Sequence, residues 1–163
     1  MGKTTLGQRM KRHSLWFTAP KKLEIKTNEL SPIGEDQVLV KTIYSAISTG
    51  TQMLVYKGQV PEDMPLDESI ESLQGKSAFP FKYGYTCVGE IVDIGKNINP
   101  NLLHKKTFAF HAHESYFLTA PDELLYLPAD FDLKKALFLP NMETAVNFIL
   151  DGRPSIGETI LVF

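Results

Sequence analysis

Two histidines and a carboxylate stand together in the run His111-Ala112-His113-Glu114. Residues two apart project from the same face of a strand, and two imidazoles beside a carboxylate could hold a metal ion. No third ligand is evident in the sequence. A solvated or packed histidine pair is therefore the favoured interpretation, with a metal site as the alternative.

The single cysteine of the chain, Cys87, limits its sulfur chemistry. One thiol excludes an internal disulfide framework and a zinc site made of four cysteines. We interpret Cys87 as a small buried residue on a strand, in preference to a reactive thiol.

Short β-strands are expected to position these residues. Apolar and polar residues alternate over 23–27, and short apolar or β-rich runs bounded by turn residues predict further strands over 14–17, 37–47, 85–94, 107–110, 116–119 and 124–127. Several short strands with irregular turns indicate a barrel or a sandwich. Residues 57–82 are rich in proline and acidic side chains and show no clear period, which is typical of a functional lid, a mobile insertion or a solvated acidic loop.

Helices are expected only near the end of the sequence. Asp132 can cap a short helix over 133–139 that Pro140 interrupts, and a second helix fits 143–150. Residues 159–163 are continuously apolar, as in a strand buried on both faces. Because such a strand finds no neighbours in this chain, we expect disorder there, docking onto the barrel or self-association with another copy.

Composition sets broad limits on function. The chain has 163 residues, of which 43% are hydrophobic and 22% charged, as in soluble globular proteins with a sizeable core. A net charge of −2 gives no broad basic face for nucleic acid. The sequence shows neither a secretory signal nor an apolar run long enough to span a bilayer, so we expect a cytoplasmic protein with no membrane partner.

The order of several segments resembles the N-terminal part of the medium-chain dehydrogenase/reductases, the superfamily of alcohol dehydrogenases and quinone reductases. Residues 45–51 (SAISTGT) and 81–95 (FKYGYTCVGEIVDIG) look like its two active-site loops. Other segments look like the strand pair that closes its barrel (115–118 and 122–128), its crossing helix (136–145) and the first strand of its nucleotide-binding domain (157–163).

The resemblance implies a mainly β fold with a few helices. A partly open GroES-like barrel over residues 14–130 would hold the substrate, after a disordered N-terminus at 1–13. Residues 131–163 would be crossing helices and the start of a truncated Rossmann domain. The family's glycine-rich turn for NAD or NADP follows that domain's first strand, and this chain contains no G-x-G-x-x-G. We therefore expect it to bind no cofactor alone and to be inactive as a fragment.

Hydroxyls stand where the resemblance places the family's catalytic zinc ligands. The matching positions are Ser48, Tyr85 and Thr86, and neutral hydroxyls are poor zinc ligands. We expect no bound zinc, so hydrogen bonds must polarise a substrate carbonyl. The candidate catalytic residues are Tyr85, Ser48, Thr49 and Thr51.

Tyr85 is the best of these candidates, because a phenol can donate to an oxyanion or relay a proton. The alternative is that Tyr85 merely fills the vacant metal space. Thr49 and Thr144 are the candidate cofactor contacts. Thr144 matches a family threonine beside the nicotinamide ring, and a purely buried helix residue is an equal alternative.

These residues support two functions. The first is a zinc-independent, NAD(P)-dependent oxidoreductase acting on an alcohol, carbonyl or enone, with loops most similar to the branch that includes bacteriochlorophyllide dehydrogenase. The second is a non-enzymatic GroES-like binding module or scaffold. An apolar or aromatic substrate would suit a pocket of Leu54, Tyr56, Phe79 and Phe81, but the same residues fit a core equally well.

Overall fold

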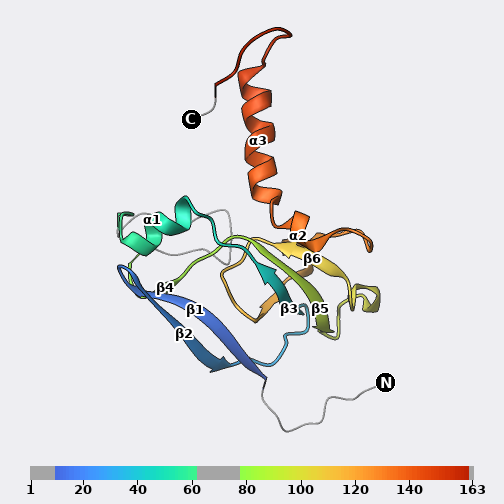
Figure 1. Cartoon of the computed structure of the whole chain (residues 1–163). Coiled ribbons are helices and arrows are strands. Elements are labelled where there is room, and N and C mark those ends of the chain that lie inside the picture. The colour runs from blue at the N-terminus through green and yellow to red at the C-terminus, as the bar shows by residue number, and fades with distance from the viewer. Residues whose placement is uncertain (1–9, 62–77, 162–163) are drawn as a thin grey trace.

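The computed structural model describes residues 10–61 and 78–161 and shows a mainly β fold with a few helices (Figure 1). Two antiparallel sheets have the strand orders β2-β1-β4 and β7-β3-β5-β6-β8. The strands are β1 (Lys11–Ala19), β2 (Lys22–Glu29), β3 (Val38–Ser45), β4 (Phe81–Lys82), β5 (Cys87–Ile94), β6 (Lys106–Ala109), β7 (Tyr116–Thr119) and β8 (Leu125–Tyr126). The helices are α1 (Thr51–Lys57), α2 (Leu133–Ala136) and α3 (Leu139–Gly152), with 3-10 turns η2 (Pro100–Leu102) and η3 (Pro121–Glu123).

The main core lies against the five-stranded sheet. Its buried members come from β3, β5, β6, β7 and the residue before β8: Val38, Val40, Cys87, Ile91, Ala109, Phe117 and Leu124. Cys87 is 1% exposed, as predicted for a packing residue, and burial raises the pKa of its thiol to about 11. Each large apolar side chain buried in this way contributes roughly 1.5–3 kcal/mol.

A second, aromatic cluster joins the small sheet to α1. Phe17 of β1 stacks on Phe81 of β4 with ring centroids 5.9 Å apart, and Val55 of α1 and Tyr83 complete the buried part. Because Phe17 pairs with Phe81 across the strands, this cluster fixes β4 and the segment that follows it. That segment leads directly to Tyr85.

The two C-terminal helices differ in how they contact the barrel. Ala136 of α2 is buried with Val88 and Phe108 in a third cluster, so α2 packs on the sheet. By contrast, α3 has no buried residue and points away from the sheets (Figure 1). Within the described ranges, no helix combines the length and apolar character needed to cross a bilayer.

The structure corrects the expected N-terminal boundary and adds a helix. β1 begins at Lys11, so residues 11–13, expected in a disordered N-terminus, form a strand because they pair with β2. Helix α1 was not predicted, and it ends where the loop over 57–82 was expected to begin. The strand β4 lies in that expected loop, while residues 62–77 lie outside the described part of the chain.

Two expectations near the C-terminus are also wrong. Pro140 does not interrupt a helix but stands in the first turn of α3, where a missing N–H costs no hydrogen bond. Residues 159–161 form no strand, and Ile160 and Leu161 are exposed. An apolar strand needs a pairing neighbour for its backbone, and no described strand pairs with this segment.

Candidate functional site

The two segments expected to carry the chemistry lie side by side. β3 and β5 are antiparallel neighbours, and their pairing places Ser45 opposite Cys87. The loop that leaves β3 therefore meets the loop that enters β5. The Ala46 N–H donates to the Thr86 carbonyl over 3.2 Å, and the Ser45 hydroxyl lies 3.1 Å from the same oxygen.

Tyr85 stands at this junction on the edge of the aromatic cluster. Its ring is half-buried and meets Tyr83 edge to face, with centroids 6.3 Å apart. Packing thus holds the ring, while the hydroxyl has no hydrogen-bond partner among the described residues. Within the described part of the chain, the phenol is thus available as a donor on a packed ring, and the packing fits equally with a residue that fills space.

The other three candidate hydroxyls lie on the neighbouring loop. Ser48 is half-buried, Thr49 is exposed, and Thr51 is the first residue of α1. None of the three has a hydrogen-bond partner in the described parts of the chain. Four hydroxyls without a partner among the described residues therefore lie on, or next to, two loops that are hydrogen-bonded to one another.

Thr144 does not join this group. It is exposed on α3, and its hydroxyl donates to the Pro140 carbonyl one turn earlier, over 3.0 Å. The alternative of a buried helix residue is therefore wrong for the structure described. No described contact links Thr144 to the two loops, and its expected place beside a nicotinamide stays a prediction.

Sequence reasoning missed the polar side chains that underlie the junction. The imidazole of His113 contacts the Ser45 hydroxyl through Nδ1 and lies 2.8 Å from the Gln52 amide oxygen through Nε2. Gln52 is 2% exposed, and its amide nitrogen is 3.5 Å from the Ala46 carbonyl. In the sequence His113 stands out only as half of a histidine pair, and nothing there indicates that position 113 lies next to position 45 in the fold.

His111 belongs to a different environment from His113. Residues 111–113 form no strand, so the expectation of two imidazoles on one strand face is wrong. His111 stacks on Phe117 with centroids 3.9 Å apart, and its Nδ1 lies 3.0 Å from the Ala112 carbonyl. Burial lowers the pKa of both histidines. Among the described residues, no three histidine, cysteine or acidic side chains gather as a metal site.

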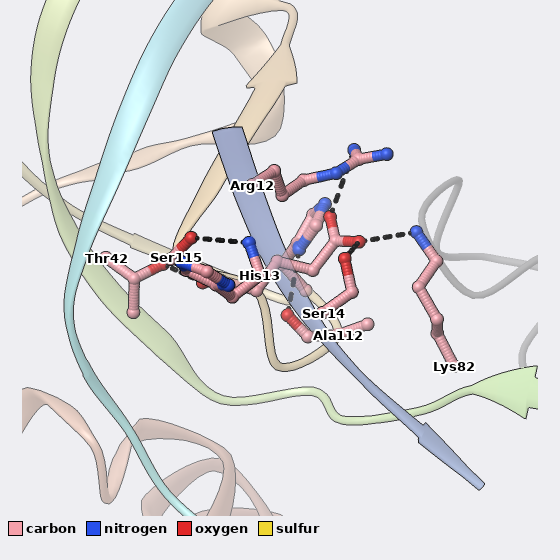
Figure 2. A network of polar contacts seen from close by, with 9 residues as sticks. Arg12, His13, Ser14, Thr42, Lys82, Ala112 and Ser115 are labelled. Atoms are coloured by element: carbon pink, nitrogen blue, oxygen red, sulfur yellow. Dashed lines mark hydrogen bonds and ion pairs between the residues drawn. The ribbon is translucent and has the colours of Figure 1, made fainter. Parts of the chain in front are cut away.

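A buried carboxylate anchors the segment that carries His113 (Figure 2). One oxygen of Glu114 is 2.7 Å from the Ser14 hydroxyl and 2.6 Å from the Lys82 ammonium, and the other is 3.4 Å from Arg12. Burial alone would raise the pKa of Glu114, but hydrogen bonds from Lys82 and Ser14 hold it below its usual value. The paired charge ties this segment to β1 and β4.

Further hydrogen bonds tie the same segment to β3. The Thr42 hydroxyl donates to the Glu114 carbonyl over 2.5 Å, and the Thr42 N–H donates to the Ser115 carbonyl over 3.0 Å. On the other side, the His13 N–H donates to the Ser115 hydroxyl over 2.9 Å (Figure 2). His113 is therefore held in place from two strands that belong to different sheets.

Several solved structures share the fold of this chain over most of its length. A quinone oxidoreductase from Coxiella burnetii matches with TM-score 0.66 and 17% identity, over 91% of this chain and 47% of its own. An E. coli CFT073 alcohol dehydrogenase with NADH matches with TM-score 0.67 and 14% identity, over 89% and 47%. A mutant enoyl thioester reductase from Candida tropicalis matches with TM-score 0.67 and 14% identity, over 90% and 44%.

The fold is that of the GroES-like domain of medium-chain dehydrogenase/reductases. The chain spans less than half the length of each of these solved proteins, and the low identities establish the fold alone. No protein-family model matches the chain, and no curated protein does.

The metal that the family resemblance implies does not fit the donors of this GroES-like domain. The three positions carry the hydroxyls of Ser48, Tyr85 and Thr86, whereas zinc favours thiolate, imidazole and carboxylate ligands. Thr86 is also 4% exposed, and its carbonyl already accepts from Ala46. This set of donors therefore does not suit a zinc ion.

The residues considered as an apolar pocket are largely core in this GroES-like domain. Phe81 is buried, with Phe79 and Tyr56 packed against the same cluster, while Leu54 is 48% exposed. A cavity of about 330 Å³ opens elsewhere, along β6 and β7. None of the candidate hydroxyls lines it, and its wall is formed by Gln37, Ala109, Phe110, His111, Phe117, Leu118, Thr119, Ala120 and Glu123.

Proposed function

We propose that this chain is the substrate domain of a zinc-independent, NAD(P)-dependent oxidoreductase acting on an alcohol, carbonyl or enone group. The observation that carries the proposal is the uncommitted Tyr85 hydroxyl at the junction of the two loops, on a ring held by Tyr83. The fold supports the class, since solved proteins that share it contain NADH or NADP.

The chemistry assigned to Tyr85 follows from where charge develops. When hydride adds to a carbonyl carbon, negative charge grows on the oxygen, and a hydroxyl placed beforehand stabilises it. The Tyr85 phenol donates this hydrogen bond, and the same bond delivers the proton that yields the alcohol. Ser48, Thr49 and Thr51 supply further donors from the neighbouring loop. Bound NADH or NADPH would supply the hydride.

The surroundings of Tyr85 favour an apolar or aromatic substrate. Tyr83, Phe81 and Phe79 lie behind the phenol, with successive ring centroids 6.5 and 5.2 Å apart. Phe81 and Tyr83 are buried, so the half-buried rings of Phe79 and Tyr85 are the ones that could offer apolar and edge-to-face contacts to a ring or an acyl chain. One solved structure of the same fold is described as bound to NADP and crotonyl-CoA, an unsaturated thioester, which keeps enones within the proposal.

A cofactor-binding comparison tests the assignment of this chain as a substrate domain. We expect calorimetry to detect no micromolar binding of NADH or NADPH to residues 1–163, because the pyrophosphate site requires a glycine turn at a helix N-terminus. The full reading frame that encodes the chain should bind one of them. Tight binding to residues 1–163 alone would place the cofactor site elsewhere.

Turnover tests the activity itself. The full reading frame is expressed and screened with NADH and NADPH against apolar aldehydes, ketones, quinones and enones, by the loss of nicotinamide absorbance. Turnover of at least one class is expected. If the expressed protein binds apolar ligands but consumes no cofactor with any substrate class, the proposal of an oxidoreductase is wrong. A non-enzymatic binding module would then be the supported function.

A further inference from the structure

The side chains of Ser45, Gln52 and His113 form a hydrogen-bonded group next to the two loops. Ser45 ends β3, Gln52 stands in the first turn of α1, and His113 comes from the segment before β7. The imidazole bridges the other two side chains, with Nδ1 at Ser45 and Nε2 at Gln52. Three parts of the chain, distant in sequence, are therefore joined through one ring.

The contacts of Gln52 favour one ring nitrogen of His113 as the carrier of the proton. The Gln52 amide nitrogen faces the Ala46 carbonyl, so the amide oxygen faces His113. An amide oxygen only accepts, so Nε2 must donate to it. A neutral imidazole has one N–H, so Nδ1 is then an acceptor, and the Ser45 hydroxyl has one proton for two acceptors in reach, Nδ1 and the Thr86 carbonyl. His113 is therefore the Nε2–H tautomer when neutral.

Two other histidines of the chain, His111 and His104, provide an internal contrast. Nδ1 of His111 faces the Ala112 carbonyl, and Nδ1 of His104 faces a carboxylate oxygen of Glu90. Both partners only accept, so each of these rings carries its proton on Nδ1 when neutral. His113 differs from them because its Nε2–H donates to the Gln52 amide oxygen.

The environment of His113 keeps the ring neutral near neutral pH. Burial lowers its pKa, and no charged group among the described residues adds to that effect. The nearest carboxylate along the chain, Glu114, is committed to Lys82 and Arg12. When the ring does gain a proton, Nδ1 becomes a donor to the Ser45 oxygen, and the Ser45 hydroxyl then donates only to the Thr86 carbonyl, 3.1 Å away.

We infer that His113 is a positioning residue for the proposed reaction. As the Nε2–H tautomer it contacts Ser45 and Gln52 on either side of the loop that carries Ser48 and Thr49, and so holds that loop against the segment that carries Tyr85. This role rests on the proposed function, since the relative position of the two loops matters only if a substrate binds between them. His113 itself touches neither the Tyr85 ring nor the candidate loop hydroxyls in the described contacts.

The tautomer is tested on the 163-residue chain without any activity. Nitrogen chemical shifts of the labelled imidazoles are recorded by NMR near pH 7.5. His113 should show a protonated Nε2 and an unprotonated Nδ1, whereas His111 should show the reverse. A protonated Nδ1 in His113, in either a neutral or a charged ring, would overturn the inference.

The positioning role is tested in the full reading frame by kinetics. His113→Ala should lower kcat by about 10- to 100-fold with a smaller change in KM, because misplaced groups lose alignment. His113→Asn keeps an acceptor for Ser45 and should recover part of that loss. The matched control is His104→Ala, on an exposed imidazole, which should change kcat by less than about twofold.

The outcomes separate the two proposals. If the wild type turns over substrate and His113→Ala retains full kcat, the positioning role is wrong while the proposed function stands. If the wild type shows no turnover with any substrate class, the proposed function is wrong and the catalytic role of His113 falls with it. Loss in His113→Ala with recovery in His113→Asn supports both.

Discussion

Gly84 leaves no room for a side chain between its own backbone and the imidazole of His113. A Cβ at position 84 would lie 2.9 Å from both Cδ2 and Nε2 of the ring. The residue also has a φ of +142°, in a region that L side chains rarely adopt. The loop that presents Tyr85 therefore depends on glycine to approach the histidine that underlies it.

Gly84→Ala should destabilise the protein by about 1–3 kcal/mol, because it combines backbone strain with displacement of His113. Urea unfolding measures the change. The matched control is Gly152→Ala at the end of α3, where nothing lies within 4 Å of the new methyl group. That variant should be neutral or slightly stabilising. Equal effects of the two substitutions would show that the loop adjusts freely.

Lys82→Met should lower the free energy of unfolding by about 2–4 kcal/mol, because it removes one partner of a buried carboxylate. The Glu114 side chain is 1% exposed, and Arg12 compensates only in part from 3.4 Å. The comparison is Lys96→Met, whose partner Glu35 is 61% exposed, and there a change below about 1 kcal/mol is expected. A loss at Lys82 no larger than at Lys96 would contradict a structural role for the Glu114 network.

Stability should fall on acidification in two steps. The pKa values of His111 and His113 are lowered in the folded chain, so their stabilising effect is complete above the unfolded value of 6.5 and is lost below it. The lowered pKa of Glu114 adds a second loss below its ordinary value of 4.5. Urea unfolding from about pH 7.5 to about pH 3 measures both steps.

His113→Asn tests the first of these steps. An asparagine does not titrate, so the variant should lose less stability than the wild type between about pH 6.5 and about pH 5. A wild type whose stability rises on acidification from neutral pH would contradict the assigned directions of the histidine pKa shifts.

Much of the β-architecture could be predicted because local patterns determine it. The strand at 116–119 is confirmed, and so is the cap at Asp132, whose carboxylate accepts from the Lys134 N–H. Helix α1 escaped prediction because its N-cap, Gly50, offers no side chain to cap with. Its stability comes from Val55 in the aromatic cluster, a contact that no local pattern reveals.

The candidate site likewise has one part that the sequence predicts and one part that depends on tertiary contacts. Similarity of short loops predicts the candidate hydroxyls, and antiparallel pairing of β3 with β5 brings the two loops that carry them together. The hydrogen-bonded group of Ser45, Gln52 and His113 could not be predicted from spacing, since Gln52 and His113 are 61 positions apart in the sequence. His113 reaches Ser45 only because Glu114 and Ser115 are anchored to both β1 and β3.

Purified protein from the full reading frame should contain far less than one zinc per chain by metal analysis. The hydroxyls of Ser48, Tyr85 and Thr86 are poor ligands for zinc, so extensive dialysis against a chelator should leave turnover unchanged. Zinc near one per chain that is lost in Ser48→Ala or Tyr85→Phe would contradict the zinc-independent account.

The most direct test of the central claim is the turnover of Tyr85→Phe in the full reading frame. Removing the phenolic donor should lower kcat by about 100- to 1,000-fold while substrate binding persists, because the lost hydrogen bond is made to the developing oxyanion. Tyr126→Phe is the matched control, since that hydroxyl donates only to the Pro121 carbonyl. Full kcat in Tyr85→Phe would show that the ring merely fills space and would contradict the account.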